Sequence, residues 1–323
     1  MNYIDFHCDT LLMLVDEEKE GQSLYSNEVA SVDFKRLKKS EAMAQFFAMF
    51  LMDEETINEH FGSDDEYINK LAKMLKDEIA ENNDIMSMAY NAEDLLKNYA
   101  SGKVSTFLTI EDGRSVDGKL EKLDEYYDLG VRLITLTWNY ENCFGYPNSK
   151  DPEIMNKGLK NFGKEAIEYM NHIGMIIDVS HLSDGGFYDV AKISKKPFVA
   201  SHSNARALSP HQRNMTDDMI KILAEKGGVM GLNFAPHFLN EDISLEDSKI
   251  ELMVKHLNHI KNIGGEDVIA LGSDFDGISG NLEIDSSDKM YLLFDALKDS
   301  GWSERLIEKL AYKNALRIIK DTL

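Results

Sequence analysis

Eight short apolar runs divide the chain, and segments with many charged residues and helical periodicity lie between them. Most of these runs are continuously apolar, which is typical of parallel strands that are covered on both faces. Strand and helix patterns that alternate eight times predict an α/β fold, a (β/α)8 barrel of the TIM type. The expected strands are residues 3–8, 42–50, 104–110, 131–137, 174–180, 197–203, 227–234 and 268–274.

The length and composition of the chain are compatible with one such barrel. Barrels of this class reach 323 residues as a single domain, and no linker or low-complexity stretch marks an internal boundary. Hydrophobic residues make up 43% of the chain, which is enough for a large core, and charged residues make up 28%. We therefore expect a single barrel domain over residues 1–323.

The charge of the chain and its lack of targeting signals argue against several classes of partner. The formal net charge of -22 disfavours nucleic acids and anionic membranes, because binding to either relies on clustered Lys and Arg. The longest nearly apolar run, residues 42–52, is too short for a membrane helix of about 20 residues. The N-terminus lacks the pattern of a secretion signal, and two cysteines do not indicate a disulfide framework. We expect a cytoplasmic protein with no nucleic-acid or membrane partner.

Side chains of the types that bind metals stand where the expected strands end. His7 and Asp9 are two residues apart at the end of the first strand, so both side chains can face the barrel axis. Active sites of this fold lie at the carboxyl ends of the strands, where the loops of the barrel meet. The candidates with the same placement in later strands are Glu111, His181, His202 and Asp274.

This combination of residue types indicates a metal centre. Zinc accepts imidazole nitrogen and carboxylate oxygen together, and two metals about 3.5–4 Å apart need a bridging anion, which Glu111 can supply. His181 and His202 would then complete a second metal site. Taken singly, Asp9 could be a helix N-cap, His181 a cap or turn residue, and Glu111 part of a turn. Their joint occurrence at strand ends favours the metal interpretation.

The other histidines and the first cysteine are expected to be structural. Cys8 lies between two candidate ligands, but its side chain would point to the opposite face of the strand, so we expect it to be a packing thiol. Five histidines lie in helical or loop segments without candidate partners, and we expect them on the surface or in the packing: His60, His172, His237, His256 and His259.

Six sequence blocks occur in an order that is characteristic of one family. They are DFHCDT at 5–10, TIEDG at 109–113, DVSHLSD at 178–184, SHSNARAL at 201–208, RNMTDD at 213–218 and GSDFDG at 272–277. In these blocks the chain resembles the membrane dipeptidase (renal dipeptidase, peptidase M19) family of the amidohydrolase superfamily, in its shorter bacterial form. The blocks together are highly specific, and they span most of the chain.

The resemblance implies a binuclear zinc centre with two Zn²⁺ per chain. His7 and Asp9 would bind one zinc, and His181 and His202 would bind the other. Glu111 would bridge the two cations. A bridging hydroxide, whose pKa the two cations lower, would be the nucleophile.

The resemblance also implies roles in proton transfer and substrate binding. Asp274 would take a proton from the hydroxide and pass it to the leaving amine. Arg213 would hold the C-terminal carboxylate of the substrate, and its structural alternative is a surface ion pair in a chain with 57 acidic residues. Resemblance to the family further suggests a homodimer.

One position departs from the family pattern. Family members such as the mammalian enzymes carry a histidine after the fourth strand that helps to polarise the scissile carbonyl, and Trp138 stands there in this chain. An indole can donate one hydrogen bond but cannot become a cation. Asn139 or Asn142 could supply the donor instead. Loss of such a donor costs about 10²–10³ in rate in other hydrolases, so we expect lower activity, altered specificity or a pocket that is built differently.

We therefore expect a zinc-dependent dipeptidase that hydrolyses small dipeptides, including those with a C-terminal D-amino acid. One alternative is another binuclear amidohydrolase activity, such as a lactonase or a deaminase. Arg213 distinguishes these, since a substrate with a free carboxylate needs it and a neutral lactone does not. A second alternative, prompted by Trp138, is a metal-binding protein of low catalytic activity.

Overall fold

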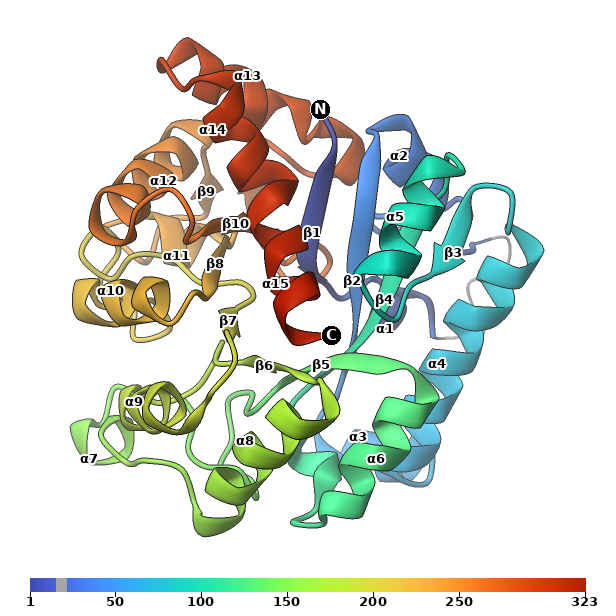
Figure 1. The fold of residues 1–323 in the computed structure, drawn as a ribbon, viewed down its shortest axis with the longest axis vertical. Helices are drawn as coiled ribbons and strands as arrows, with labels where there is room; N and C mark the ends of the chain where they lie inside the picture. The colour runs from blue at the N-terminus through green and yellow to red at the C-terminus, as the bar shows by residue number, and fades with distance from the viewer. Residues whose placement is uncertain (16–21) are drawn as a thin grey trace.

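Parallel strands close into a ring in the computed structural model, which describes residues 1–15 and 22–323 (Figure 1). The ring consists, in order, of β1 (Tyr3–Cys8), β2 (Ala42–Phe50), β4 (Val104–Glu111), β5 (Val131–Thr135), β6 (Ile176–Asp178), β7 (Val199–Ala200), β8 (Val229–Leu232) and β10 (Ile269–Leu271). β1 pairs with β10 on one side and with β2 on the other, and β2 also pairs with β4, which closes the sheet. The predicted (β/α)8 barrel is confirmed.

Several strands end earlier than the apolar pattern predicts. β1 and β2 have the predicted bounds, whereas β6 and β7 are shorter than the predicted runs 174–180 and 197–203. The residues after them leave the ladder and form loops at the carboxyl end of the barrel. In the large sheet, β3 (Met86–Met88) was not predicted. It pairs with the start of β4, and its three residues are too few to form a recognisable apolar run.

Helices surround the ring, and short polar side chains set where several of them begin. The longer helices are α4 (Asp64–Glu81), α5 (Ala92–Ala100), α6 (Leu120–Leu129), α8 (Asn161–Ile173), α9 (Asp184–Ile193), α10 (Asp217–Glu225), α12 (Ile250–Gly264), α13 (Tyr291–Asp299) and α15 (Asn314–Thr322). The side chains of Ser63, Ser183 and Thr216 accept hydrogen bonds from backbone N–H groups in the first turns of α4, α9 and α10. Within the described residues, no helix has the length and hydropathy to cross a membrane.

The remaining elements are short. The helices are α1 (Thr10–Leu14), α2 (Phe34–Lys39), α3 (Glu54–His60), α7 (Pro152–Met155), α11 (Pro236–Leu239) and α14 (Glu304–Glu308), with 3-10 turns at Gly113–Val116 and Ser287–Lys289 and a π-helical turn at Lys309–Lys313. Outside the barrel, β9 (Asp247–Ser248) pairs with β11 (Asn281–Leu282).

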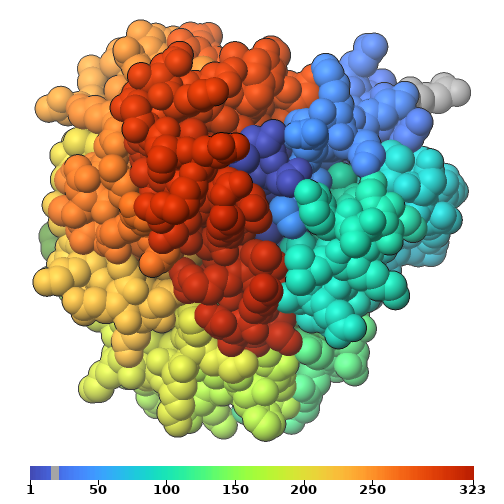
Figure 2. Space-filling model, turned by 45° about the horizontal axis from the view of Figure 1, so that its top comes forward, coloured from blue at the N-terminus to red at the C-terminus, as the bar shows by residue number. Residues whose placement is uncertain are grey.

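The C-terminal helix closes the amino end of the barrel. Ile318 and Ile319 of α15 belong to the same buried cluster as the side chains inside the ring. Among these, the ring of Phe46 stacks on Phe107 with 4.5 Å between centroids and packs against Phe6 at 4.9 Å. Figure 1 shows α15, in red, lying over the middle of the ring, and in Figure 2 the red C-terminal segment runs across the centre of this face of the molecule. The barrel interior is therefore a packed core at this end, and the site lies at the opposite end.

Two glycines allow three strands to approach closely below the site. A Cβ atom on Gly231 would lie 1.9 Å from the carbonyl oxygen of Ser201, and one on Gly272 would lie 1.8 Å from the same oxygen. Any side chain at either position would push the end of β7 away from β8 and β10. This close approach holds the residues that follow β7, including His202, over the barrel axis.

Candidate metal centre

The six candidate residues come together at the carboxyl end of the barrel, from the ends of five strands or the loops after them, and β1 supplies two of them, His7 and Asp9. Their side chains form three overlapping groups in which all potential ligand atoms lie within 4.8 Å of one another. The groups are His7–Asp9–Glu111, Glu111–His181–His202 and His7–His202–Asp274. Sequence positions as far apart as 7 and 274 thus supply a single cluster.

Glu111 divides the cluster into two ligand sets. Its Oε2 atom lies 3.1 Å from Nε2 of His7, whereas its Oε1 atom lies 3.0 Å from Nε2 of His181 and 3.5 Å from Nε2 of His202. The first set also contains Asp9, whose Oδ2 is 3.3 Å from His7 Nε2. One carboxylate oxygen therefore faces each set, which is the arrangement that a carboxylate bridging two cations requires.

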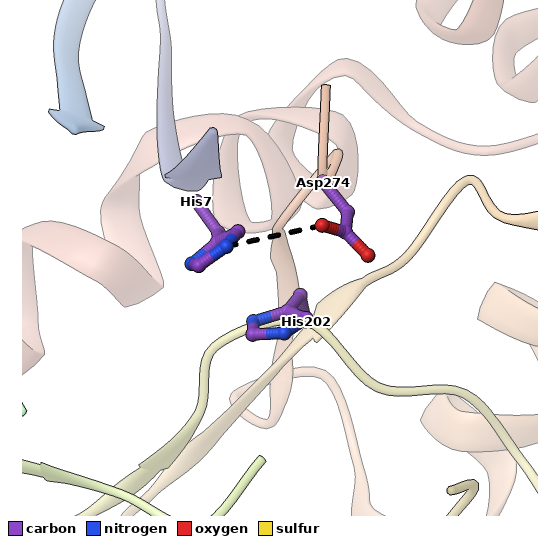
Figure 3. A group of neighbouring side chains, drawn as sticks. All are labelled: His7, His202 and Asp274. Atoms are coloured by element: carbon purple, nitrogen blue, oxygen red, sulfur yellow. Dashed lines mark ion pairs between the residues drawn. The ribbon is translucent and has the colours of Figure 1, made fainter. Parts of the chain in front are cut away.

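Asp274 lies at the junction of the two sets. Its Oδ1 is 3.8 Å from Nε2 of His7, and the His7 ring stacks on the His202 ring with 3.9 Å between centroids (Figure 3). Its other oxygen, Oδ2, accepts a hydrogen bond of 2.7 Å from the amide Nδ2 of Asn233. One oxygen is thus held in place while the other faces the centre. Asn233 was not predicted, although a polar residue near the end of an apolar run was a possible signal.

Burial and mutual repulsion perturb the charges in the cluster. Burial, together with neighbouring carboxylates, raises the pKa of Asp9 to about 6 and the pKa of Asp274 to about 8. Burial opposes ionisation of Glu111 as well, but the imidazoles around it hold its pKa well below the usual range. Burial and the nearby Arg213 lower the pKa of His181 to about 4. These shifts mark a site where several anions are packed together out of water.

The donor atoms of the cluster fit a divalent cation. Nδ1 of His7 and Oδ1 of Asp9 are buried without a hydrogen-bond partner among the described residues. Buried polar atoms are normally paired, so such orphaned atoms call for a missing partner. A cation would both satisfy the free lone pairs and offset the repulsion between the carboxylates. Imidazole nitrogen with carboxylate oxygen is a donor set that zinc accepts.

The backbone is strained where it presents two of these side chains. His181 and Asp274 have positive φ angles of 66° and 63°, which cost side-chain-bearing residues about 1–3 kcal/mol. In the GSDFDG block, Gly277 packs directly on the cluster, since a Cβ there would lie 2.1 Å from Oδ2 of Asp9 and 2.7 Å from Oδ1 of Asp274. The second glycine of this block is therefore required by close approach to two carboxylates.

A pocket of about 340 Å³ opens over the cluster. Its floor contains Asp9, Glu111 and Asp274, and its walls include Phe50 and Trp138. Small-molecule sites typically occupy about 300–1,000 Å³, so this pocket is suited to a small ligand. The mixture of an acidic floor and aromatic walls allows it to hold a ligand with both polar and apolar parts.

Of the three residues considered at the departure from the family pattern, Trp138 and Asn139 line this pocket and Asn142 does not. Trp138 packs edge-on against Phe50, with 4.9 Å between ring centroids, and forms part of the wall. Asn139 lines the pocket, and its Oδ1 lies 3.2 Å from Nδ1 of His181. The other ring nitrogen of His181, Nε2, lies 3.0 Å from Oε1 of Glu111 and 3.2 Å from Nε2 of His202. The amide of Asn142 instead donates to Asp112 Oδ1 and the Leu136 carbonyl, away from the pocket.

Arg213 lies beside the cluster and is not among the pocket-lining residues. It is 5% exposed, and it donates from Nη1 to Ser203 Oγ at 2.7 Å and from Nη2 to the carbonyl of His202 at 2.8 Å. Its Nε has no hydrogen-bond partner in the described part of the chain. The ring of Phe238, a pocket residue, lies 5.7 Å from the guanidinium. The surface ion pair that was the alternative for Arg213 is therefore wrong.

The expectation that five other histidines lie on the surface or in the packing holds for His60 and His172, which are exposed, and for His256. His256 is fully buried and packs between the backbone of Ala205 and Leu239, to which its ring nitrogens are hydrogen-bonded. His259 is half-buried and, against the expectation, has a partner, since its Nε2 lies 2.7 Å from Oδ1 of Asp217. His237 needs a refinement, because it is exposed but lines the pocket, and its Nδ1 donates to the carbonyl of Ile243 at 2.8 Å. Its placement depends on the short helix α11, which the apolar pattern did not predict.

The chain is similar in sequence and in structure to several known proteins. The dipeptidase tcpJ of Claviceps purpurea is 29% identical over 90% of this chain and 69% of its own length. A crystal structure of a dipeptidase described as a metallopeptidase of family M19 is 26% identical, covers 100% of this chain and 98% of its own, and has a TM-score of 0.89. A metallopeptidase from Rhodobacter sphaeroides, liganded with a phosphinate mimic of the dipeptide L-Ala-D-Ala, is 25% identical with a TM-score of 0.90 and covers 100% and 99% of the two chains.

The family profile described as membrane dipeptidase (peptidase family M19) matches residues 1–323, which is the whole chain. The match includes all six blocks that carried the resemblance. The chain therefore belongs to the membrane dipeptidase family, peptidase family M19.

Proposed function

We propose that this protein is a dipeptidase that uses two zinc ions to hydrolyse small dipeptides, including those with a C-terminal D-amino acid. The observation that carries the proposal is the position of Glu111, whose two oxygens face two separate ligand sets below one pocket. Membership in a dipeptidase family supports the reaction class. The phosphinate mimic of L-Ala-D-Ala on the Rhodobacter sphaeroides protein supports the substrate class.

In this proposal each ligand set holds one cation. His7 and Asp9 would hold the first, His181 and His202 would hold the second, and Glu111 would contribute to both. When bound, the two cations supply a Lewis acid for the scissile carbonyl and a water of lowered pKa as the nucleophile.

The proposed role of Asp274 is to move a proton. One of its oxygens faces the cluster, and Asn233 holds the other, so the carboxylate stays oriented toward the reacting atoms. Burial raises the pKa of Asp274 to about 8 in the metal-free protein, and cations beside it would lower that value. A carboxylate whose pKa lies between its usual value and this raised value can accept a proton from the attacking water and return it to the departing amine.

The proposed role of Arg213 is to attract the C-terminal carboxylate of the dipeptide. The guanidinium is buried close to the cluster, its Nε has no hydrogen-bond partner among the described residues, and it lies 5.7 Å from the ring of Phe238, which lines the pocket. A buried cation at this place favours an anionic substrate over the neutral ring of a lactone, which was the first alternative. Trp138 and Phe50 would pack against a substrate side chain, and this wall replaces the polar donor of the family pattern.

The test is a dipeptide panel combined with metal analysis of the same sample. Purified protein should contain close to two metals per chain and release amino acids from L-Ala-D-Ala and related dipeptides, and a chelator should abolish the release. Fully metallated protein that hydrolyses no dipeptide would support the second alternative, a metal-binding protein of low activity. The homodimer and the cytoplasmic location remain predictions.

A further inference from the structure

We propose that Asp178 and Ser201 form a hydrogen-bond relay that fixes the proton of His202 on Nδ1 and so leaves Nε2 free to bind metal. This inference rests on the proposed binuclear centre and concerns residues that do not touch it. Asp178 and Ser201 belong to the blocks DVSHLSD and SHSNARAL, in which only the histidines had an expected role.

Asp178 is a fully buried carboxylate surrounded by hydrogen-bond donors. Its Oδ1 accepts from the backbone N–H groups of Ser180 at 2.9 Å and Ser201 at 2.8 Å. Its Oδ2 accepts from the hydroxyls of Thr135 at 2.7 Å and Ser201 at 2.5 Å. These four donors occupy the lone pairs of the two carboxylate oxygens and leave none to carry a proton. Asp178 therefore acts as an ionised acceptor. Bonds of this kind, to a buried charge, are among the strongest in proteins.

The direction of the relay follows from the single proton of the Ser201 hydroxyl. The hydroxyl donates to Asp178, because a carboxylate 2.5 Å away must receive that proton. Oγ therefore presents a lone pair to Nδ1 of His202, which lies 2.7 Å away. The imidazole must then donate from Nδ1, and a neutral ring with its proton on Nδ1 has a lone pair on Nε2. That nitrogen is the one 3.5 Å from Glu111 and 3.2 Å from Nε2 of His181.

Substitution of Asp178 by Asn should reverse the relay. The amide oxygen must stay at the Oδ1 position, where two fixed backbone N–H groups donate, so the NH₂ group takes the place of Oδ2. It would then donate to Ser201, whose own proton would turn toward Nδ1 of His202. This reversal moves the imidazole proton to Nε2 and blocks the metal-binding lone pair. Ser201→Ala removes the relay without reversing it, so its effect should be smaller.

A second carboxylate in the barrel provides a matched control. Asp5 binds Ser273 as Asp178 binds Ser201: its carboxylate accepts hydrogen bonds from the backbone N–H of Ser273 at 2.8 Å and from its hydroxyl at 2.6 Å. Asp5→Asn therefore alters the same kind of buried hydrogen-bonded contact between neighbouring strands. Within the residues described, however, no imidazole nitrogen is hydrogen-bonded to Ser273. Thr135→Val is a further control, since it removes one donor from Asp178 and leaves the contact with Ser201 intact.

The experiment measures the His202 tautomer and the metal affinity separately. Long-range ¹H–¹⁵N spectra of the metal-free protein should show His202 protonated on Nδ1 in the wild type and on Nε2 in Asp178→Asn. Zinc titrations against a competing chelator should show about 10–100-fold weaker binding at one of two sites in Asp178→Asn, a smaller loss in Ser201→Ala, and little change in Thr135→Val or Asp5→Asn.

Two results would overturn the relay. One is a wild-type protein in which the His202 proton is on Nε2. This measurement does not depend on the folding of any variant. The other is an Asp178→Asn or Ser201→Ala protein that binds both metals as the wild type does. If Asp178→Asn does not fold, Ser201→Ala and the wild-type spectrum decide the outcome. A wild type that binds no metal would instead refute the binuclear centre, so the two failures are distinguishable.

Discussion

Removal of the metals should destabilise the fold, and the loss should be larger at pH 8 than at pH 6. A ligand present at 1,000 times its dissociation constant stabilises a protein by about 4 kcal/mol, so two cations contribute about 8 kcal/mol. The entropy of unfolding is about 2.1 cal/mol/K per residue, or about 0.7 kcal/mol/K for 323 residues. Chelation should therefore lower Tm by about 12 °C under these conditions.

The pH dependence comes from the raised pKa values of the buried carboxyls. Asp274 has a pKa of about 8 in the folded metal-free protein and a model value of 3.8. Between pH 6 and 8 the folded state keeps a proton that the unfolded chain has lost, so stability falls as the pH rises. This single group removes about 2 kcal/mol over that interval, which is about 3 °C in Tm. Metal binding requires ionised ligands, so the metal-loaded protein should not show this loss.

Thermal unfolding followed by circular dichroism at pH 6, 7 and 8, with zinc or with a chelator, measures the effect. The difference in Tm between the two samples should widen steadily with pH. Asp274→Asn serves as the control, because an amide does not titrate and the chelated variant should lose less stability between pH 6 and 8. Equal Tm values with and without metal, or a difference that narrows as the pH rises, would refute the assignment of a buried anionic centre.

Three further substitutions test individual parts of the site. Asp274→Asn should lower kcat about 10²–10⁴-fold while metal content stays at two per chain, and a loss of metal would argue against a proton-transfer role. Arg213→Ala should mainly raise KM for dipeptides and have less effect on amidated substrates; equal losses on both would contradict its assigned role. Gly277→Ala should displace Asp9 and weaken metal binding, whereas Gly145→Ala, whose added methyl meets nothing closer than 3.4 Å, should not.

The barrel could be predicted because its strands are buried on both faces. Such strands appear as continuous apolar runs, and β1 and β2 were predicted with their observed bounds. Burial on both faces also makes the end of a strand hard to locate from the sequence. Residues such as Ser201 and Asn233 lie beyond the paired part of their strands but remain fully buried. Short elements such as β3 and α11 carry too few residues to show a period, and the position of His237 at the pocket was missed for that reason.

The ligand cluster was accessible from sequence, but its supporting contacts were not. Parallel strands bring their carboxyl ends to one place, so His7 and Glu111 could be expected to meet before any coordinates were known. The partner of a buried polar residue depends instead on register between neighbouring strands. Asp178 appears as an isolated acid in an apolar run, and only the fold places it against Ser201.

The central claim is that one carboxylate, Glu111, joins two metal sites. The most direct measurement is the zinc stoichiometry of the wild type and of Glu111→Gln, determined by titration of the metal-free proteins. The wild type should bind two zinc ions per chain, and Glu111→Gln should lose tight binding at both sites because an amide cannot bridge two cations as an anion. A wild type that binds one zinc or none, or a Glu111→Gln variant that still binds two tightly, would contradict the account.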